Sequence, residues 1–258
     1  MRHTPRKRFG QNFLTDTQVI ANIIRAINPQ AQDQLVEIGP GLGALTLPLL
    51  QKLDHLDVIE LDRDIVKRLE QTFDTEKLTI YSADALKFDF ASIGSNLRVV
   101  GNLPYNISTP ILFHLSTFAA NIKDMHFMLQ KEVVERMVAM PSTSEYGRLT
   151  VMLQYRFELE LVFIVPPESF NPIPKVESAI VRIHPIKQPT LIATDEKLFS
   201  QVVTSAFSQR RKTLRNTLRD YLNPEDFEAL ALDPGLRAEN LSVTQFVSVA
   251  NYLAEVSN

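Results

Sequence analysis

The chain has 258 residues, 45% of them hydrophobic, and a formal net charge of -3, so it is long enough for one large domain or for a large and a small one. It contains no cysteine and its five histidines lack metal-ligand spacing, which argues against disulfides, a thiolate nucleophile and a metal site. No window approaches the roughly 18 uninterrupted apolar residues of a membrane span, and the N-terminus lacks the apolar core of a signal peptide, so we expect a cytoplasmic protein with no membrane partner.

The first half of the chain predicts an α/β fold. A helix is expected over residues 16–27. After it, short apolar runs alternate with amphipathic segments, which predicts strands at 34–39, 56–61, 78–83 and 97–102 and helices at 43–53 and 62–73. Short β-rich runs separated by helical patterns are typical of a doubly wound, mostly parallel sheet with both faces covered.

The later elements predict how the sheet ends and where a second domain begins. We expect a helix near 109–118, a strand at 125–130, a helix at 131–140, and two long strands at 149–165 and 176–185 that end the sheet as an antiparallel hairpin. Four prolines between 166 and 175 exclude regular structure and predict a stiff loop. From Asp195 onward nearly everything is predicted as helix, so we expect domains at 1–188 and 189–258, the second small and all-helical.

A glycine-rich turn follows the strand at 34–39. Gly39, Gly41 and Gly43 stand between a strand and a helix, where missing side chains let the backbone pass close to a ligand. Glu60 ends the next strand and can accept both hydroxyls of a ribose, and Asp84, after the third strand, would lie beside an adenine ring. The pattern indicates an adenosine-containing cofactor. It leaves open S-adenosylmethionine, a nicotinamide dinucleotide, and a plain glycine turn with carboxylates in water.

The fourth strand ends in the sequence Asn102-Leu103-Pro104-Tyr105. If the cofactor is S-adenosylmethionine and the nucleophile is the exocyclic amine of a base, the delocalised lone pair of that amine must be freed. The Asn102 side-chain oxygen and the Leu103 carbonyl, held by Pro104, would accept the two amine hydrogens and favour the developing ammonium. Tyr105 would stack on the base, with Phe170 as a second stacking face. The alternatives are a proline-terminated strand and a core phenylalanine.

Two basic segments are present in this acidic protein. Residues 1–25 hold five bases against one acid, and residues 209–219 hold five bases and no acid. Such patches suggest a localised anionic partner, and we expect Arg210, Arg211 and Lys212 to contact RNA phosphates. The alternative is that they form a solvated face, or tie the C-terminal segment to the catalytic domain through acids such as Asp220.

Six motifs follow one another along the chain: "FGQNFL", "VEIGPGLGALT", "VIELD", "GNLPYNIST", "FNPIPKVESAIVRIHP" and "RRKTLRN". Together they resemble the ribosomal RNA adenine dimethyltransferases over almost the whole chain, and the short helical tail is similar to that of the bacterial small-subunit (16S) members. The resemblance implies a Rossmann-like class I methyltransferase sheet and S-adenosylmethionine as cofactor. The implied substrate is a pair of adjacent adenosines, each methylated twice, in a hairpin near the 3′ end of 16S rRNA within a pre-assembled small subunit. The implied cofactor contacts are Asn12, Leu14, Gly39, Glu60, Asp84 and Asn102.

The expected protein is therefore a monomeric adenosine dimethyltransferase of small-subunit rRNA. Two alternatives stay open: a methyltransferase of the same family that acts on large-subunit RNA, and a non-catalytic RNA-binding assembly factor. A pure binder would have no use for the sequence from Asn102 to Tyr105. A nicotinamide oxidoreductase would need a proton relay that the sequence does not display.

Overall fold

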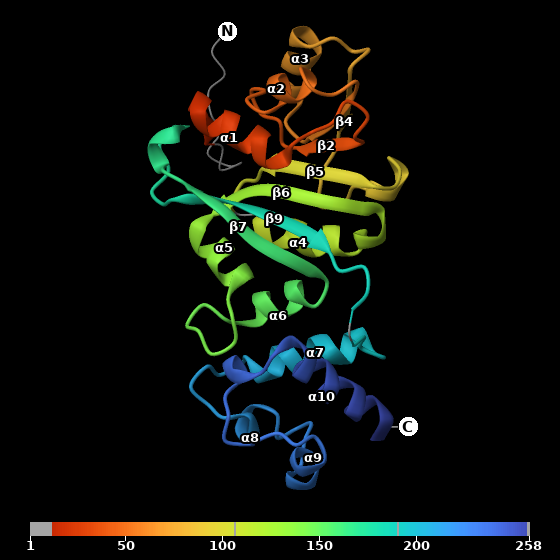
Figure 1. Ribbon diagram of the computed structural model, residues 1–258, viewed down its shortest axis with the longest axis vertical. Coiled ribbons are helices and arrows are strands. Elements are labelled where there is room, and N and C mark those ends of the chain that lie inside the picture. Colours follow the sequence, from red (N-terminus) through yellow and green to blue (C-terminus); the bar gives the residue numbers. More distant parts are fainter. Residues whose placement is uncertain (1–11, 106, 190, 257–258) are drawn as a thin grey trace. The chain divides into compact units, whose positions relative to one another are not determined.

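The computed structural model describes residues 12–105, 107–189 and 191–256 (Figure 1). These residues form two compact units. One unit takes the described chain up to Val134 together with Glu158–Pro185, and the other takes Glu135–Phe157 together with the described chain from Ile186 onward. Residues 135–157 therefore lie with the C-terminal part, although the sequence led us to assign them to the first domain. The functional roles of the two domains stay predictions.

The first unit is built on a seven-stranded sheet with the order β4-β3-β2-β5-β6-β9-β7 (Figure 1). Neighbouring strands from β4 to β6 are parallel, and β9 pairs antiparallel with β6. The predicted mostly parallel sheet with an antiparallel end is confirmed. The strands are β2 (Leu35–Ile38), β3 (Leu56–Glu60), β4 (Leu78–Ser82), β5 (Leu97–Asn102), β6 (Ile122–Gln130), β7 (Phe157–Val165) and β9 (Ser178–Pro185).

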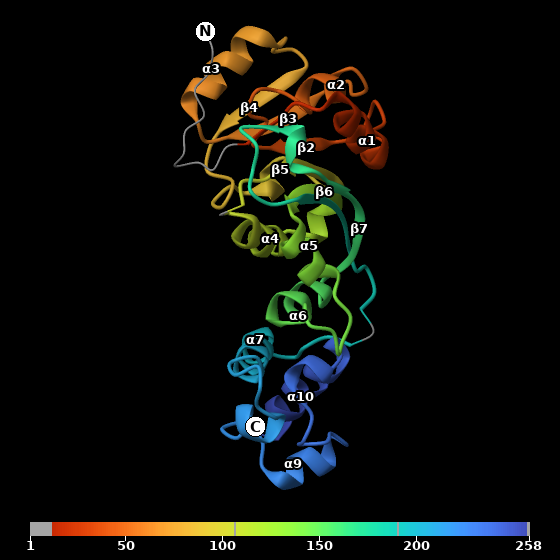
Figure 2. The same ribbon diagram turned by 90° about the vertical axis from the view of Figure 1, so that its left-hand side faces the viewer.

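Helices cover both faces of this sheet, and Figures 1 and 2 show α1 and α2 on one side and α4 on the other. Ile23 of α1, Leu49 of α2 and Leu69 of α3 share one apolar core with strand residues such as Val58. Covering both faces keeps the strands buried and leaves their carboxyl ends as the edge where a ligand can enter. The helices up to residue 138 are α1 (Thr17–Ile27), α2 (Thr46–Leu50), α3 (Arg63–Thr72), α4 (Ser108–Ser116) and α5 (Lys131–Val138).

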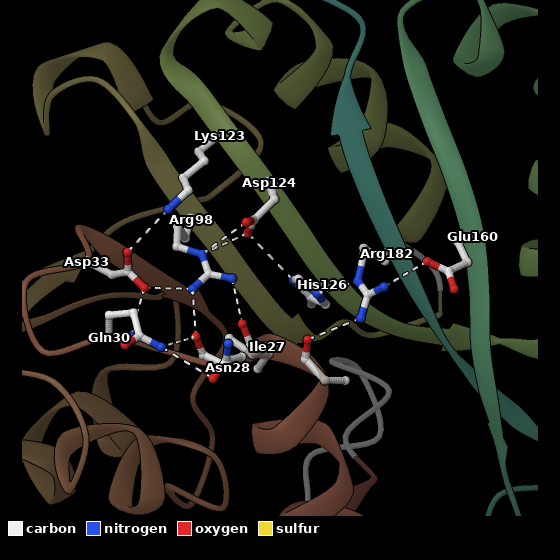
Figure 3. A network of polar contacts seen from close by, with 11 residues as sticks. Ile27, Asn28, Gln30, Asp33, Arg98, Lys123, Asp124, His126, Glu160 and Arg182 are labelled. Carbon is white, nitrogen blue, oxygen red and sulfur yellow. Dashed lines mark hydrogen bonds and ion pairs between the residues drawn. The ribbon is translucent and has the colours of Figure 1, made fainter.

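A buried arginine fixes the end of α1 to the sheet (Figure 3). Arg98 on β5 donates from Nε to both carboxylate oxygens of Asp124 (3.0 and 3.1 Å) and from Nη1 to Asp33 (2.6 Å). Its remaining donors reach the backbone carbonyls of Ile27 (2.6 Å) and Asn28 (3.3 Å). The last carbonyls of a helix have no partner within the helix, so this guanidinium supplies them with hydrogen bonds. Its positive charge also interacts favourably with the negative end of the helix dipole.

A second arginine continues the same network (Figure 3). Arg182 on β9 donates to the carbonyl of Ala26 (3.3 Å), to Nε2 of His126 (3.1 Å) and to Glu160 (2.8 Å). Burial lowers the pKa of His126 to about 4, so this histidine is neutral at physiological pH and can accept from the guanidinium. The two arginines together hold consecutive carbonyls at the end of α1.

The segment 149–165, which the sequence predicted as one strand, is a helix followed by a strand. α6 (Arg148–Gln154) precedes β7, which begins at Phe157. An apolar run does not by its pattern distinguish a buried helix from a strand. Tertiary contacts decide here, because the Gln154 amide donates to two backbone carbonyls of the preceding segment (2.9 and 3.0 Å) and Val151 is fully buried.

The proline-rich segment 166–175 contains a short strand, so the expectation that prolines exclude regular structure was wrong there. β8 (Phe170–Asn171) pairs antiparallel with β1 (Phe13–Leu14) in a separate two-stranded sheet. Neither β8 residue is a proline, so both keep the N–H groups that a ladder needs. The pairing continues where the N–H of Thr15 donates to the carbonyl of Ser169 (2.8 Å).

The second unit is helical, as the sequence predicted for the residues after 195. Its core includes Phe199 of α7 and Phe246 of α10, two helices that lie side by side (Figure 2). Tyr146 and Val151 belong to the same core, which explains why residues 135–157 go with this unit. None of the helices in the described ranges is long and apolar enough to cross a membrane. The helices after residue 195 are α7 (Glu196–Ala206), α8 (Leu214–Thr217), α9 (Pro224–Ala229) and α10 (Val243–Val256).

Candidate active site

A cavity of about 670 Å³ opens in the first unit at the carboxyl ends of β2, β3 and β5. Parallel strands end at the same edge of a sheet, so residues far apart in sequence meet there. The residues that the sequence predicted for cofactor or base binding all line this cavity: Asn12, Leu14, Gly39, Gly41, Glu60, Asp84, Asn102, Leu103, Pro104, Tyr105 and Phe170. The predicted RNA contacts Arg210, Arg211 and Lys212 lie in the second unit.

The glycine turn forms one wall of the cavity. Gly39 has a φ of 66°, in the left-handed region that glycine adopts without steric cost. A Cβ at Gly39 would meet no atom within 4 Å, so the backbone here faces open space. A Cβ at Gly43, in contrast, would lie 2.9 Å from the ring of Phe73. The turn therefore presents bare backbone to a ligand at one glycine and packs closely against the end of α3 at the other.

Glu60 ends β3 with a side chain that is almost fully buried. Its Oε1 accepts a hydrogen bond from the N–H of Asp62 (2.8 Å). Burial raises the pKa of Glu60, although neighbouring backbone N–H groups oppose the effect. A buried carboxylate needs donors for its remaining lone pairs. The two hydroxyls of a ribose are donors of the right kind, so the residue fits the role predicted for it.

Glu37 on β2 also lines the cavity, although its position in the sequence did not predict a functional role. Its side chain accepts a hydrogen bond from Oγ1 of Thr46 (2.7 Å). Burial, together with the nearby charge of Glu60, raises the pKa of Glu37 to about 7. The sequence contained a signal for this residue, because a glutamate inside an otherwise apolar buried strand is rare unless it has a hydrogen-bonding partner or a function.

The raised pKa of Glu37 predicts a pH-dependent stability. Between its ordinary value of about 4.5 and about 7 the folded protein keeps a proton that the unfolded chain has lost, so stability falls as pH rises through this window. Glu37→Gln removes the charge and keeps an acceptor for Thr46. Urea unfolding measures the free energy of unfolding of both proteins at pH 5 and at pH 8. The difference, variant minus wild type, should be larger at pH 8 by a few kcal/mol, roughly the free energy that corresponds to the pKa shift.

The comparison with the wild type at each pH is essential to this experiment. The lowered pKa of His126 has the opposite sign, because the unfolded chain binds a proton that the folded protein does not, and stability therefore rises with pH. That contribution is common to both proteins and cancels in the difference. Equal pH dependence in the two proteins would contradict the buried, proton-holding Glu37.

The end of β5 brings an amide, a carbonyl and a ring to the cavity. Asn102 donates from Nδ2 to the carbonyl of Asn12 (3.2 Å), and its Oδ1 accepts no hydrogen bond from the described residues. The side-chain oxygen is therefore available to a ligand. The N–H of Leu103 donates to the carbonyl of Met128 on β6 (3.2 Å), which fixes the backbone at this position. The Tyr105 hydroxyl lies 2.9 Å from Oγ of Ser178.

The segment before α1 closes the cavity through its pairing with β8. Phe13, Thr15 and Ile20 line the cavity in addition to the predicted Asn12 and Leu14. Sequence reasoning missed these three residues because nothing in the local pattern shows that this segment and the first turn of α1 reach the site. Phe170 is only 3% exposed and belongs to the apolar core as well as to the cavity wall. Its stacking role stays a prediction.

Comparison with known proteins identifies the family. The model of the ribosomal RNA adenine dimethylase family matches residues 2–255. The chain belongs to this family. The ribosomal RNA small subunit methyltransferase A of Nitrosospira multiformis is 64% identical over 256 residues, which is 99% of each chain. That of Nitrosomonas europaea is 62% identical over 255 residues, again 99% of each chain. The resemblance found in the motifs is thus confirmed.

Solved structures agree with this assignment. A dimethyladenosine transferase from Plasmodium falciparum is 27% identical, with a TM-score of 0.78 over 92% of this chain and 95% of that one. The 23S rRNA methyltransferase ErmE is 25% identical, with a TM-score of 0.73 over 94% of this chain and 100% of that one. The predicted Rossmann-like methyltransferase fold is confirmed. Members of this family use S-adenosylmethionine, so membership excludes the nicotinamide alternative.

Proposed function

We propose that this dimethylase transfers methyl groups from S-adenosylmethionine to the exocyclic amines of two adjacent adenosines in the 3′-terminal hairpin of 16S rRNA. The observation that carries the proposal is the position of Asn102, which lines the same cavity as the glycine turn and Glu60 and whose side-chain oxygen accepts no hydrogen bond from the described residues. The proposed substrate is the hairpin within a pre-assembled small subunit, and the enzyme acts on it as a monomer in the cytoplasm.

The proposed chemistry needs little from the protein beyond placement. The bound cofactor supplies a methyl group that its sulfonium already activates, so an in-line nucleophile is sufficient. The Asn102 Oδ1 and the Leu103 carbonyl accept the two hydrogens of the adenine amine. This aims the nitrogen lone pair at the methyl group and stabilises the positive charge that develops on the nitrogen. Both acceptors are held before the reaction starts, Asn102 through Asn12 and Leu103 through Met128.

The target base has to leave its helix to reach these acceptors. Unstacking costs a few kcal/mol, and an aromatic side chain at the destination offsets about 1–3 kcal/mol of it. Tyr105 lines the cavity next to the two acceptors and is the proposed stacking surface. Phe170 forms part of the same cavity wall and is the proposed second surface.

One experiment tests the substrate directly. Tritiated S-adenosylmethionine is offered to small subunits from cells that lack the methylation, to mature small subunits and to large subunits, and the label is mapped. We expect label only in the first sample, on two adjacent adenosines near the 3′ end of 16S rRNA. Label in large subunits would favour the large-subunit alternative. No label in any RNA would contradict the enzymatic function and favour an assembly factor.

Glu60 provides a prediction for cofactor binding. Glu60→Ala should weaken S-adenosylmethionine binding roughly 10- to 150-fold, because the ribose hydroxyls lose a charged acceptor worth about 1.5–3 kcal/mol. Titration calorimetry measures the effect. Glu70→Ala, at an exposed position on α3, is the matched control and should bind as the wild type does. Unchanged affinity in Glu60→Ala would contradict the assignment of the ribose site.

The basic segment of the second unit divides into two kinds of residue. Arg210 contacts the carbonyl of Ser144 and lies 3.7 Å from Glu239, so it is partly engaged within its own unit. Arg211 and Lys212 are exposed, and their side chains make no hydrogen bond or ion pair with the described residues. These two are the better candidates for phosphate contacts.

A plot of log affinity for small subunits against log salt has a negative slope. Replacing Arg211 and Lys212 together by glutamine should make this slope less steep by about two units, one for each phosphate that the variant no longer neutralises. Thermal stability and cofactor binding should not change. Arg210→Gln serves as the comparison, and should reduce stability because it removes interactions within the unit. An unchanged salt slope in the double variant would assign these residues to a solvated face.

A further inference from the structure

The hydroxyl of Tyr105 has a partner that the chemistry proposed above does not use. It lies 2.9 Å from Oγ of Ser178, the first residue of β9. Ser178 is fully buried and stands opposite Gln130 in the ladder between β6 and β9. A serine fixed in this way is a rigid point of attachment, while Tyr105 is only half-buried and follows the end of β5.

Ser178 also ends the loop that carries part of the cavity wall. The proline-rich loop from Ser169 to Ser178 includes Phe170, which forms part of the cavity wall. At its start the loop is held by the hydrogen bond from Thr15 to Ser169, and at its end by the contact between Ser178 and Tyr105. The loop thus joins the segment beside Asn12 to the ring beside Asn102.

A tyrosine side chain held only by its backbone can change rotamer about the Cα–Cβ bond, and such a change moves the whole ring. A hydrogen bond at the hydroxyl fixes the far end of the Tyr105 ring and so selects one rotamer before a base arrives, and a preorganised site loses less free energy on binding. We propose that Ser178 is a positioning residue: its hydroxyl holds the Tyr105 ring in the orientation that stacks on the target adenine. The proposal rests on the methyltransferase function proposed above and adds a residue to it.

The alternative is a buried serine that only satisfies its own hydroxyl, and a double-mutant cycle separates the two roles. Ser178→Ala and Tyr105→Phe remove the same hydrogen bond from opposite sides. Each should lower the single-turnover rate about 3- to 10-fold and leave cofactor affinity unchanged, and the double variant should be no slower than either single variant. Ser169→Ala, a buried serine at the other end of the loop, should combine additively with Tyr105→Phe.

A fluorescent base gives a second readout that a loss of stability would not imitate. With 2-aminopurine at the target adenosine, stacking on Tyr105 quenches the emission, and both single variants should quench less than the wild type. If Ser178→Ala does not fold, Tyr105→Phe alone carries this measurement. Additive rate effects, or wild-type rates and quenching in the variants, would overturn the role of Ser178. Absence of methyl transfer in the wild type would instead overturn the proposed function.

Discussion

Asn102→Ala should lower the single-turnover rate of methyl transfer about 10²- to 10³-fold, the usual cost of removing one preorganised group that stabilises charge in a transition state. The Oδ1 of Asn102, which accepts no hydrogen bond from the described part of the chain, is the acceptor that the variant loses, and the Leu103 carbonyl alone cannot orient both amine hydrogens. A rapid-quench measurement with saturating small subunits and cofactor gives this rate without interference from product release.

Binding measurements separate this effect from damage to the site. RNA affinity should stay near the wild-type value, because phosphate contacts supply most of it and lie elsewhere. Cofactor affinity must be measured independently, since the variant also loses the hydrogen bond from Nδ2 to Asn12. Asn22→Ala, on α1 and outside the cavity lining, is the control and should react at the wild-type rate. Most of the rate surviving in Asn102→Ala would contradict the lone-pair argument.

Arg98→Met should lower the free energy of unfolding of the first unit by about 3–5 kcal/mol, because it leaves buried acids without their partner. The side chains of Arg98 and Asp124 are each only 7% exposed, and the variant also removes the donor that the carbonyl of Ile27 accepts from at the end of α1. Burial opposes the ionisation of Asp33, yet Gln30 and Arg98 hold its pKa below the ordinary value. Hydrogen exchange at the amides of β5 reports this unit specifically.

Two further variants make the result specific to the buried arginine. Arg182→Met removes an arginine from the same network, but its ion pair with Glu160 is largely exposed and its other contacts are single hydrogen bonds to His126 and to the carbonyl of Ala26. A smaller loss of about 1–2 kcal/mol is therefore expected. Arg98→Met combined with Asp124→Asn should recover part of the loss, since the second change neutralises the acid left unpaired. Equal losses in Arg98→Met and Arg182→Met would contradict the dominant role of burial.

The sequence predicted which residues meet in the cavity because the order of its elements was readable. Glu60, Asp84 and Asn102 each stand at the end of an apolar run, and alternating strands and helices imply a parallel sheet. Parallel strands end at one edge, so these three residues had to converge there. Their roles in binding and catalysis go beyond that geometry and stay predictions for the experiments above.

The helix at the start of residues 149–165 and the raised pKa of Glu37 depend on contacts between distant segments, and the local sequence does not encode these contacts. The run at 149–165 fits a helix or a strand equally well, and only the contacts of Gln154 and Val151 decide for a helix in its first part. Glu37 belongs to an ordinary strand until burial beside Glu60 raises its pKa to about 7.

The amino-acid sequence by itself therefore determined the family, through its six motifs. It also determined the four parallel strands of the first half and the residues at their ends, through apolar runs that alternate with amphipathic segments. Only the tertiary structure decided that Thr15 pairs with Ser169 and that Tyr105 is held by Ser178. The physical reason is that a hydrogen bond between segments more than 70 residues apart leaves no periodic trace in either segment. Such a bond exists only because the sheet brings the two segments together.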